Sequence, residues 1–278
     1  MRPPPELPLP GPDLFRLDGK VAVITGAGGT FGRAIALGLA RAGATILATD
    51  LDADRAAETA RLVEAAGGRS VSHPGDVGRD EDADGVFAVV DREFGQIDIL
   101  VNNAGINPTQ GKPERFPIAV WDRVLRTNLT GMLLFAQRAA VRMIAAGRGG
   151  SVINVSSTAG STVLGRGNLA YGVSKSGVIQ MTRELAVEWA RHDIRVNAIQ
   201  PCQFLNEGWR PAVSDPARAA LVERVVSGIP LGRMGEPEEI VGPVLFLASP
   251  AASMVTGAIL AVDGGNLAFN AGATLSPD

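Results

Sequence analysis

The chain reads VAVITGAGGTFG over residues 21–32, a short apolar run followed by a glycine-rich turn. The next residues, from Phe31 to Ala42, carry apolar side chains at helical spacing, so the stretch predicts a strand, a tight turn and a helix. Glycines in such a turn let a phosphate approach the backbone, and the start of the helix supplies unpaired N–H groups. The stretch therefore predicts a site for the diphosphate of a dinucleotide.

An acidic residue, Asp50, ends the next apolar run, 24 residues after the first glycine of the turn. A carboxylate at this place accepts hydrogen bonds from an adenosine ribose and repels a 2′-phosphate. Neither Gly29 nor Leu51 supplies a cation that would offset the repulsion, although Arg33 and Arg55 lie nearby in the sequence. The sequence therefore favours NAD over NADP as the cofactor.

Short apolar runs rich in β-branched residues alternate with longer amphipathic stretches from Lys20 onward. This alternation is typical of parallel strands joined by helices that cover both faces of a sheet. The expected strands span residues 21–25, 44–50, 70–74, 97–103, 151–156, 194–199 and 258–262. The expected helices include residues 31–42, 55–66, 81–94, 121–146 and 171–191. We therefore expect an α/β fold with one parallel sheet of seven strands.

The two ends of the chain and one internal segment depart from this alternation. Six of the 18 prolines fall within the first twelve residues, so residues 1–14 are expected to form an extended or disordered arm. Residues 15–278 are expected to form one domain, because seven strands with interleaved helices leave no room for a second. Residues 203–228 are rich in Pro, Glu, Trp and Arg and lack a strand partner, which predicts a lid.

The composition argues against several kinds of function. One Cys and two His make a Cys-rich zinc site or a disulfide framework impossible, and no metal is expected. The net charge of −3, with no cluster of Lys and Arg, argues against a nucleic-acid surface. Residues 240–262 carry no charge, but glycines and prolines interrupt them, so a helix, a turn and a strand are expected rather than a membrane span. The N-terminus lacks the apolar core of a secretory signal, so a cytoplasmic location is expected.

The chain contains a single tyrosine, Tyr171, and Lys175 follows it at a spacing of four on an expected helix. This spacing places both side chains on one face of the helix. A nearby ammonium favours the phenolate and lowers the pKa of the phenol from its ordinary value of about 10. The pair can then move a proton to or from a substrate oxygen. The alternative is an amphipathic helix that carries both residues incidentally.

Several further motifs follow the glycine-rich turn in a fixed order. They are Asp76-Val77, NNAG at 102–105, Asn128, SSTAG at 156–160, YGVSK at 171–175, Pro201 and VDGG at 262–265. Together with TGAGGTFG at 25–32, they resemble the short-chain dehydrogenase/reductase family in order and spacing. The resemblance runs from Leu17 to Asn266 and implies a Rossmann-type, doubly wound sheet with the strand order 3-2-1-4-5-6-7.

The resemblance also implies the roles of site residues. Tyr171 would be the acid or base, Ser157 would position the substrate oxygen, and Lys175 would also hold the nicotinamide ribose. Asn128 would hold a water that links Lys175 to solvent. Hydride would pass between NAD and the carbinol carbon of a secondary alcohol. The residues expected to contact NAD are Gly26, Gly28, Thr30, Phe31, Gly32, Asp50, Leu51, Asp76, Val77, Asn103, Ala104, Gly105, Tyr171, Lys175, Pro201 and Phe204.

Three positions differ from the common pattern of the family. Thr30 stands in the place of the middle glycine, and its hydroxyl is expected to cap the helix or touch phosphate. Cys202 replaces a glycine, and Asn206 replaces a threonine that often contacts the cofactor. The loop over the nicotinamide is therefore expected to behave differently in this chain, with Cys202 as a small lining residue rather than a nucleophile.

Polar side chains are frequent in the segments that the resemblance places around the substrate, residues 106–116, 158–169 and 203–228. They include Asn107, Gln110, Arg166, Asn168, Gln203, Asn206, Glu207, Trp209 and Arg210. This mixture favours a small hydroxylated substrate, such as a polyol, a sugar or a sugar acid. The alternatives are an NADPH-dependent reductase of 3-oxoacyl thioesters on acyl carrier protein and a catalytically silent nucleotide-binding protein. The family also implies a homo-oligomer, either a tetramer or a dimer, that pairs the two longest helices.

Overall fold

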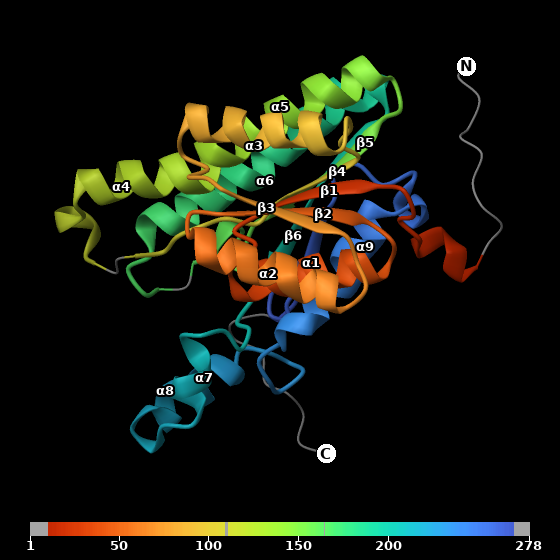
Figure 1. The fold of residues 1–278 in the computed structure, drawn as a ribbon. Coiled ribbons are helices and arrows are strands. Elements are labelled where there is room, and N and C mark those ends of the chain that lie inside the picture. The colour runs from red at the N-terminus through yellow and green to blue at the C-terminus, as the bar shows by residue number, and fades with distance from the viewer. Residues whose placement is uncertain (1–10, 109–110, 164, 270–278) are drawn as a thin grey trace.

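The computed structural model describes residues 11–108, 111–163 and 165–269 (Figure 1). Seven strands form one parallel sheet in the order β3-β2-β1-β4-β5-β6-β7, which confirms the expected topology. Each expected strand is present, with ends that differ by two residues or fewer. The strands are β1 (Val21–Thr25), β2 (Thr45–Asp50), β3 (Ser70–Pro74), β4 (Ile99–Asn102), β5 (Gly150–Val155), β6 (Ile194–Pro201) and β7 (Ile259–Val262).

Helices cover both faces of this sheet (Figure 1). One face carries α1 (Thr30–Arg41), α2 (Ala53–Ala65) and α9 (Val241–Ala248). The other face carries α3 (Asp80–Glu93), α5 (Gly131–Ala146) and α6 (Leu169–Trp189). Successive residues of a strand point to opposite faces, so Ala22 and Ile24 pack toward α1 and α9 while Val23 packs toward α3 and α5. Burial on both faces explains why the strands are apolar without alternation.

The expected helix over residues 121–146 is present, and it includes one turn that is not α-helical. Helix α4 (Ile118–Leu125) begins after Pro117, and a π segment, Arg126–Thr130, separates it from α5. A single π turn inside a helix adds a residue to the turn and is frequent at functional sites. Here it carries Asn128, whose side chain is held from outside the helix, as described below.

The stretch Ile118–Ala146 is long and apolar enough to span a membrane by length and composition. Its buried face includes Phe135, Ala139 and Met143, which pack against the sheet in one of the two core layers. Its other side carries Arg138 and Arg142, which form ion pairs with carboxylates of α3. The stretch therefore packs as a core helix of the α/β fold.

The N-terminal arm is described only at its end, because residues 1–10 lie outside the described residues. Pro12–Phe15 form a single 3-10 turn, so the expectation of extended chain is wrong for residues 12–14. Proline stands at the start of this turn, where its fixed φ suits a helix and its missing N–H costs nothing.

Residues 203–228 form two short helices that project from the body of the molecule (Figure 1). They are α7 (Trp209–Val213) and α8 (Ala219–Val226), with a 3-10 turn at Pro216–Arg218 between them. The segment was expected to lack a strand partner, but Phe204 forms an isolated parallel bridge with Gly235. This bridge fixes the beginning of the segment beside the last part of the chain before α9.

Candidate active site

A cavity of about 940 Å³ lies where the strands β1 to β6 end. The position is the one at which open α/β sheets bind ligands. The expected cofactor residues that line it are Gly26, Thr30, Phe31, Asp50, Leu51, Asp76, Val77, Asn103, Ala104, Gly105, Pro201 and Phe204. Ser157, Tyr171 and Lys175 line the same cavity. The structure therefore brings the cofactor motifs and three of the four expected catalytic residues together.

The glycine-rich turn is closely packed. Gly26 has φ of +63°, and a Cβ atom there would lie 2.9 Å from the Cα of Ala104. A Cβ on Gly32 would lie 2.1 Å from the carbonyl oxygen of Gly26, so Gly32 lies behind the cavity lining and lets the turn close. Both positions therefore require glycine.

The start of α1 fits an anionic group. Gly29 is the N-cap residue and no side chain caps this end, while Gly29, Thr30 and Phe31 all line the cavity. Uncapped N–H groups at a helix N-terminus bind phosphate. The expected capping by the Thr30 hydroxyl is not found, because Thr30 is already the first helical residue.

Asn103 braces the turn from the neighbouring strand end. Its Nδ2 atom donates to the carbonyl oxygens of Thr25 (2.9 Å) and Gly26 (3.0 Å). In return, the hydroxyl of Thr25 accepts hydrogen bonds from the backbone N–H groups of Asn103 and Ala104, at 3.0 and 3.1 Å. These four hydrogen bonds join the end of β4 to the end of β1.

Asp50 is held at the end of β2 by backbone donors. Its Oδ2 accepts from the N–H of Gly28 (2.9 Å) and its Oδ1 accepts from the N–H of Asp52 (3.1 Å). Gly28 lies behind the cavity lining, between Asp50 and Arg55. The guanidinium of Arg55 donates to the carbonyl oxygen of Gly28 at 3.0 Å and to Glu207 at 2.6 Å.

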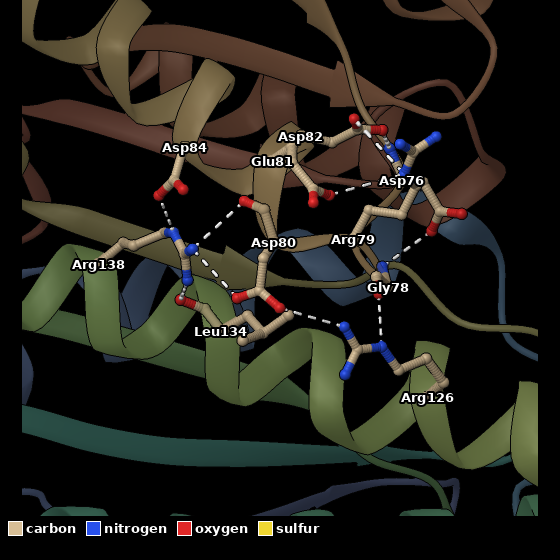
Figure 2. Close-up of polar contacts among 10 residues, drawn as sticks. All are labelled: Asp76, Gly78, Arg79, Asp80, Glu81, Asp82, Asp84, Arg126, Leu134 and Arg138. Atoms are coloured by element: carbon tan, nitrogen blue, oxygen red, sulfur yellow. Dashed lines mark hydrogen bonds and ion pairs between the residues drawn. The ribbon is translucent and has the colours of Figure 1, made fainter.

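The loop after β3, which carries Asp76 and Val77, is tied to the π segment (Figure 2). Within the loop, Asp76 accepts from the N–H of Gly78 at 2.8 Å, and Asp82 accepts from the N–H of Asp76 at 2.9 Å. From the π segment, Arg126 donates to the carbonyl oxygen of Gly78 at 2.5 Å and to Asp80 at 3.3 Å. The loop that carries Asp76 and Val77 into the cavity lining thus contacts a distant part of the chain.

Tyr171 and Lys175 lie one turn apart on α6, as their spacing predicted. The Nζ atom of Lys175 lies 5.7 Å from the centre of the Tyr171 ring and donates to the carbonyl oxygen of Val155 at 2.7 Å. The hydroxyls of Tyr171 and Ser157 share a hydrogen bond. Ser157 follows β5 and also accepts from the N–H of Ala159 at 3.2 Å. The end of β5 and helix α6 therefore position the three polar groups.

Burial governs the protonation of this pair. It raises the pKa of Tyr171, and the hydrogen bond with Ser157 opposes part of that shift. The expected lowering of the Tyr171 pKa is thus wrong for the structure described here, because desolvation of the phenolate dominates. Burial also lowers the pKa of Lys175 to about 8. Burial therefore shifts both groups toward their neutral forms, but Lys175 stays mostly protonated below about pH 8.

Asn128 is fully buried and lies behind the cavity lining. Its Oδ1 accepts from the N–H of Ile106 (2.8 Å), and its Nδ2 donates to the carbonyl oxygen of Ile106 (2.9 Å) and to Ser174 (3.1 Å). The Oδ1 of Asn128 and the Nζ of Lys175 both lie 3.4 Å from the place where Gly105 would carry a Cβ. Asn128 and Lys175 therefore face the same small space.

The other end of the cavity is lined by residues expected to surround the substrate. They are Asn107, Arg166, Asn168, Gln203, Asn206 and Trp209. Glu207 and Arg210 are absent from this lining and instead form ion pairs with Arg55 and Glu236. Gln110 lies outside the described residues.

Some lining residues were missed by sequence reasoning. Arg123 lies on α4 and Thr127 lies on the π segment. The only feature of the sequence that could have indicated them is that both lie close to Asn128 on the same helix. The other lining residues outside the expected sets are Gly29, Arg55, Gly75, Val155 and Ser156.

Cys202 also lines the cavity, but its thiol is not activated. Its Sγ donates to the carbonyl oxygen of Asp263 at 3.3 Å, and burial raises its pKa to about 11. A thiol that stays protonated is a poor nucleophile, which supports its interpretation as a small lining residue. Across the described ranges, no group of three or more His, Cys, Asp or Glu could hold a metal ion.

Known proteins resemble this chain over most of its length. A family model described as enoyl-(acyl carrier protein) reductase matches residues 26–266. The 2-dehydro-3-deoxy-D-gluconate 5-dehydrogenase of Escherichia coli is 41% identical over 91% of this chain and 98% of its own. The D-threitol dehydrogenase of Mycolicibacterium smegmatis is 41% identical over 90% of this chain and 94% of its own.

A solved structure agrees with the fold and with these sequence matches. The gluconate 5-dehydrogenase of Burkholderia cenocepacia, solved with NADP and tartrate, is 35% identical, with a TM-score of 0.84 over 93% of this chain and 99% of its own. The chain therefore belongs to the short-chain dehydrogenase/reductase family, as an oxidoreductase that acts on CH–OH groups.

Proposed function

We propose that the protein transfers hydride between NAD(H) and the secondary alcohol or ketone of a small hydroxylated substrate, a polyol, a sugar or a sugar acid. The observation that carries this proposal is the shared cavity of Ser157, Tyr171 and Lys175 with the glycine-rich turn and Asp50. A catalytically silent nucleotide-binding protein would have no need of a tyrosine hydroxyl paired with a serine hydroxyl beside a buried lysine.

The catalytic roles follow from the positions of the hydroxyls. When bound, the nicotinamide cofactor supplies the acceptor or donor of hydride. Ser157 holds the substrate oxygen by a hydrogen bond, and Tyr171 takes the hydroxyl proton during oxidation and returns it during reduction. The hydrogen bond between the two hydroxyls supports this assignment, because one oxygen atom of a substrate can then contact both.

Lys175 and Asn128 complete the proposed proton path. Lys175 holds the nicotinamide ribose and favours the phenolate when it is charged. Asn128 holds a water beside Lys175, supported by the approach of the Asn128 Oδ1 and the Lys175 Nζ to Gly105. The pKa of Lys175, lowered to about 8, makes this lysine able to gain and lose a proton in the range of physiological pH.

Two features of the adenosine end support NAD as the cofactor. Asp50 places a carboxylate at the end of β2, and the nearby cation, Arg55, is already paired with Glu207. Titrating the protein with NADH and NADPH tests this choice, and we expect tighter binding of NADH. A clear preference for NADPH would contradict it and would favour the 3-oxoacyl thioester reductase, for which acetoacetyl-CoA is a direct probe.

The polar lining at the other end of the cavity supports a hydroxylated substrate. The Escherichia coli and Mycolicibacterium smegmatis relatives are named for a sugar acid and a polyol. A panel of polyols, sugars and sugar acids, followed by NADH absorbance, tests the substrate class. We expect turnover within this panel, and turnover of acetoacetyl-CoA alone would contradict the proposal.

The domain organisation and assembly belong to the same proposal. Residues 15–278 are proposed to form one domain, of which residues 109–110, 164 and 270–278 lie outside the described residues. Residues 203–228 are proposed to form the lid, supported by Gln203, Phe204 and Trp209 in the cavity lining. The proposal includes a cytoplasmic location and a homo-oligomer, a tetramer or a dimer. The exposed apolar side chains of Ile118 and Val187, on α4 and α6, support the assembly. Light scattering of the purified protein tests the assembly, and a monomer at micromolar concentration would contradict it.

A further inference from the structure

We propose that Arg166 binds a carboxylate of the substrate, so that the preferred substrates are sugar acids rather than neutral polyols or sugars. This inference rests on the proposed function and narrows its substrate class. It is carried by the distribution of charge in the cavity, by the contacts of Arg166 and by one unpaired oxygen atom of Asn168.

The two ends of the cavity differ in charge. Its lining carboxylates, Asp50 and Asp76, follow β2 and β3 at the adenosine end. Ser157 and Tyr171 line the other end, where Arg166 adds a positive charge and, within the described ranges, no carboxylate joins the lining. A cation in a confined, partly dry site attracts an anion much more strongly than one in open water.

Arg166 is held in place without using its hydrogen-bond donors on protein groups. Its guanidinium carbon lies 5.9 Å from the ring centre of Trp209, within the range of a cation–π contact. The side chain of Arg166 has no hydrogen bond or ion pair in the part of the chain that the structure describes, whereas Arg210, next to Trp209, pairs with Glu236. A guanidinium with free N–H groups matches the two oxygens of a carboxylate.

Asn168, two residues after Arg166, adds a second polar side chain to the cavity lining. Its Oδ1 atom is buried and has no hydrogen-bond partner among the described residues, and Asn168 lines the cavity. Buried polar atoms normally have a partner, and a hydroxyl of a bound substrate can donate to this oxygen. Arg166 and Asn168 together therefore fit a carboxylate and a nearby hydroxyl, the two groups of a hydroxy acid.

Matched pairs of acid and polyol test this inference. D-gluconate and D-glucitol, and likewise D-galactonate and galactitol, differ at the acid carbon while most of the carbon chain is the same. We expect wild-type protein to favour the acid in kcat/KM. Arg166→Gln is expected to lower kcat/KM for the acid by about 10- to 100-fold, mainly through KM, because hydrogen bonds between charged groups are lost. Its kcat/KM for the polyol is expected to stay within about threefold.

Arg210→Gln is the matched control, because Arg210 neighbours Trp209 but does not line the cavity. Arg210→Gln is expected to leave kcat/KM unchanged for both the acid and the polyol. An equal loss for acid and polyol in Arg166→Gln would show a structural role and overturn the inference. Wild-type protein that oxidises polyols but not acids would overturn it and leave the proposed function standing. Wild-type protein that neither oxidises any of the four compounds nor binds them in calorimetry with NADH present would overturn both.

Discussion

The guanidinium of Arg55, on α2, lies 2.6 Å from the carboxylate of Glu207 in the 203–228 segment. The same guanidinium donates to the carbonyl oxygen of Gly28, whose own N–H is bound by Asp50. One arginine thus connects the proposed ribose site to the proposed lid. Under the proposed function, we expect this contact to involve the lid in the choice between NAD and NADP.

Glu207→Gln is expected to shift that choice. Without the carboxylate, the guanidinium of Arg55 can form an ion pair with the 2′-phosphate of NADP. The ratio of kcat/KM for NADP to that for NAD should therefore rise by about two- to fivefold. The effect is small because exposed ion pairs contribute about 0–1 kcal/mol. Steady-state kinetics with both cofactors measure it. Glu58→Gln, which removes an exposed carboxylate paired with Arg61 on the same helix, is the control. An unchanged ratio in Glu207→Gln would show that Glu207 does not restrain Arg55.

Arg126→Gln is expected to weaken cofactor binding without slowing chemistry. Arg126 holds the loop of Asp76 and Val77 through the carbonyl oxygen of Gly78. Losing about 1 kcal/mol of binding free energy for NAD would raise its KM about fivefold. The value of kcat should stay within about twofold. Arg142→Gln, which breaks a similar ion pair with Asp91 away from the cavity, should change neither constant. A fall in kcat with unchanged KM would contradict a positioning role.

Two glycines with positive φ separate the cost of backbone strain from the cost of close packing. Gly19 has φ of +70° and nothing within 4 Å of its Cβ position, whereas Gly26 has φ of +63° and Ala104 at 2.9 Å. Gly19→Ala should lower the free energy of unfolding by about 1 kcal/mol. Gly26→Ala should lower it by about 2 kcal/mol more, because the chain after β4 must move. Urea unfolding measures both, and equal losses would mean that the contact with Ala104 is easily relieved.

Stability should rise with pH through the titration of Lys175. Its pKa is about 8 in the folded protein and 10.5 in the unfolded chain. Below pH 8 both states are protonated, and the folded state carries the whole cost of the buried charge, about 3 kcal/mol at 1.36 kcal/mol per pKa unit. Between pH 8 and 10.5 the unfolded chain binds more protons, so this cost disappears as pH rises.

Lys175→Met isolates this contribution. Between pH 7.5 and 9.5, the free energy of unfolding of wild type should rise by about 2 kcal/mol relative to the variant. The range stops at 9.5 because the raised pKa of Tyr171 has the opposite effect above pH 10. The variant also loses the hydrogen bond to Val155, which changes its free energy of unfolding by the same amount at every pH and leaves the slope unaffected. Parallel curves for the two proteins would contradict a buried lysine with a lowered pKa.

The sequence predicted the strands and the Tyr171–Lys175 pair because both depend on local patterns. Every strand except β3 is mainly an apolar run, and a spacing of four places two side chains on one face of a helix. The π segment was not predicted, because no local sequence pattern marks it. Asn128 bonds to Ile106 on the loop after β4, 22 residues earlier, and no periodicity reports that contact.

The electrostatics of the site also depend on tertiary packing. The direction of the Tyr171 pKa shift was predicted wrongly, because the sequence shows the neighbouring lysine and does not show how deeply both groups are buried. Likewise, the contact of Arg166 with Trp209 joins residues 43 positions apart in the sequence, on segments without a shared motif. Burial and long-range pairing were therefore the features that needed the structure.

Turnover by Tyr171→Phe tests the central claim most directly, because Tyr171 is the only tyrosine in the chain and no other phenol can replace it. The substitution removes one oxygen atom and keeps the ring. With any substrate that wild type oxidises, we expect kcat to fall by about 100-fold or more, while binding of NADH, measured by fluorescence, stays within about threefold. An unchanged kcat with intact NADH binding would contradict proton transfer by Tyr171.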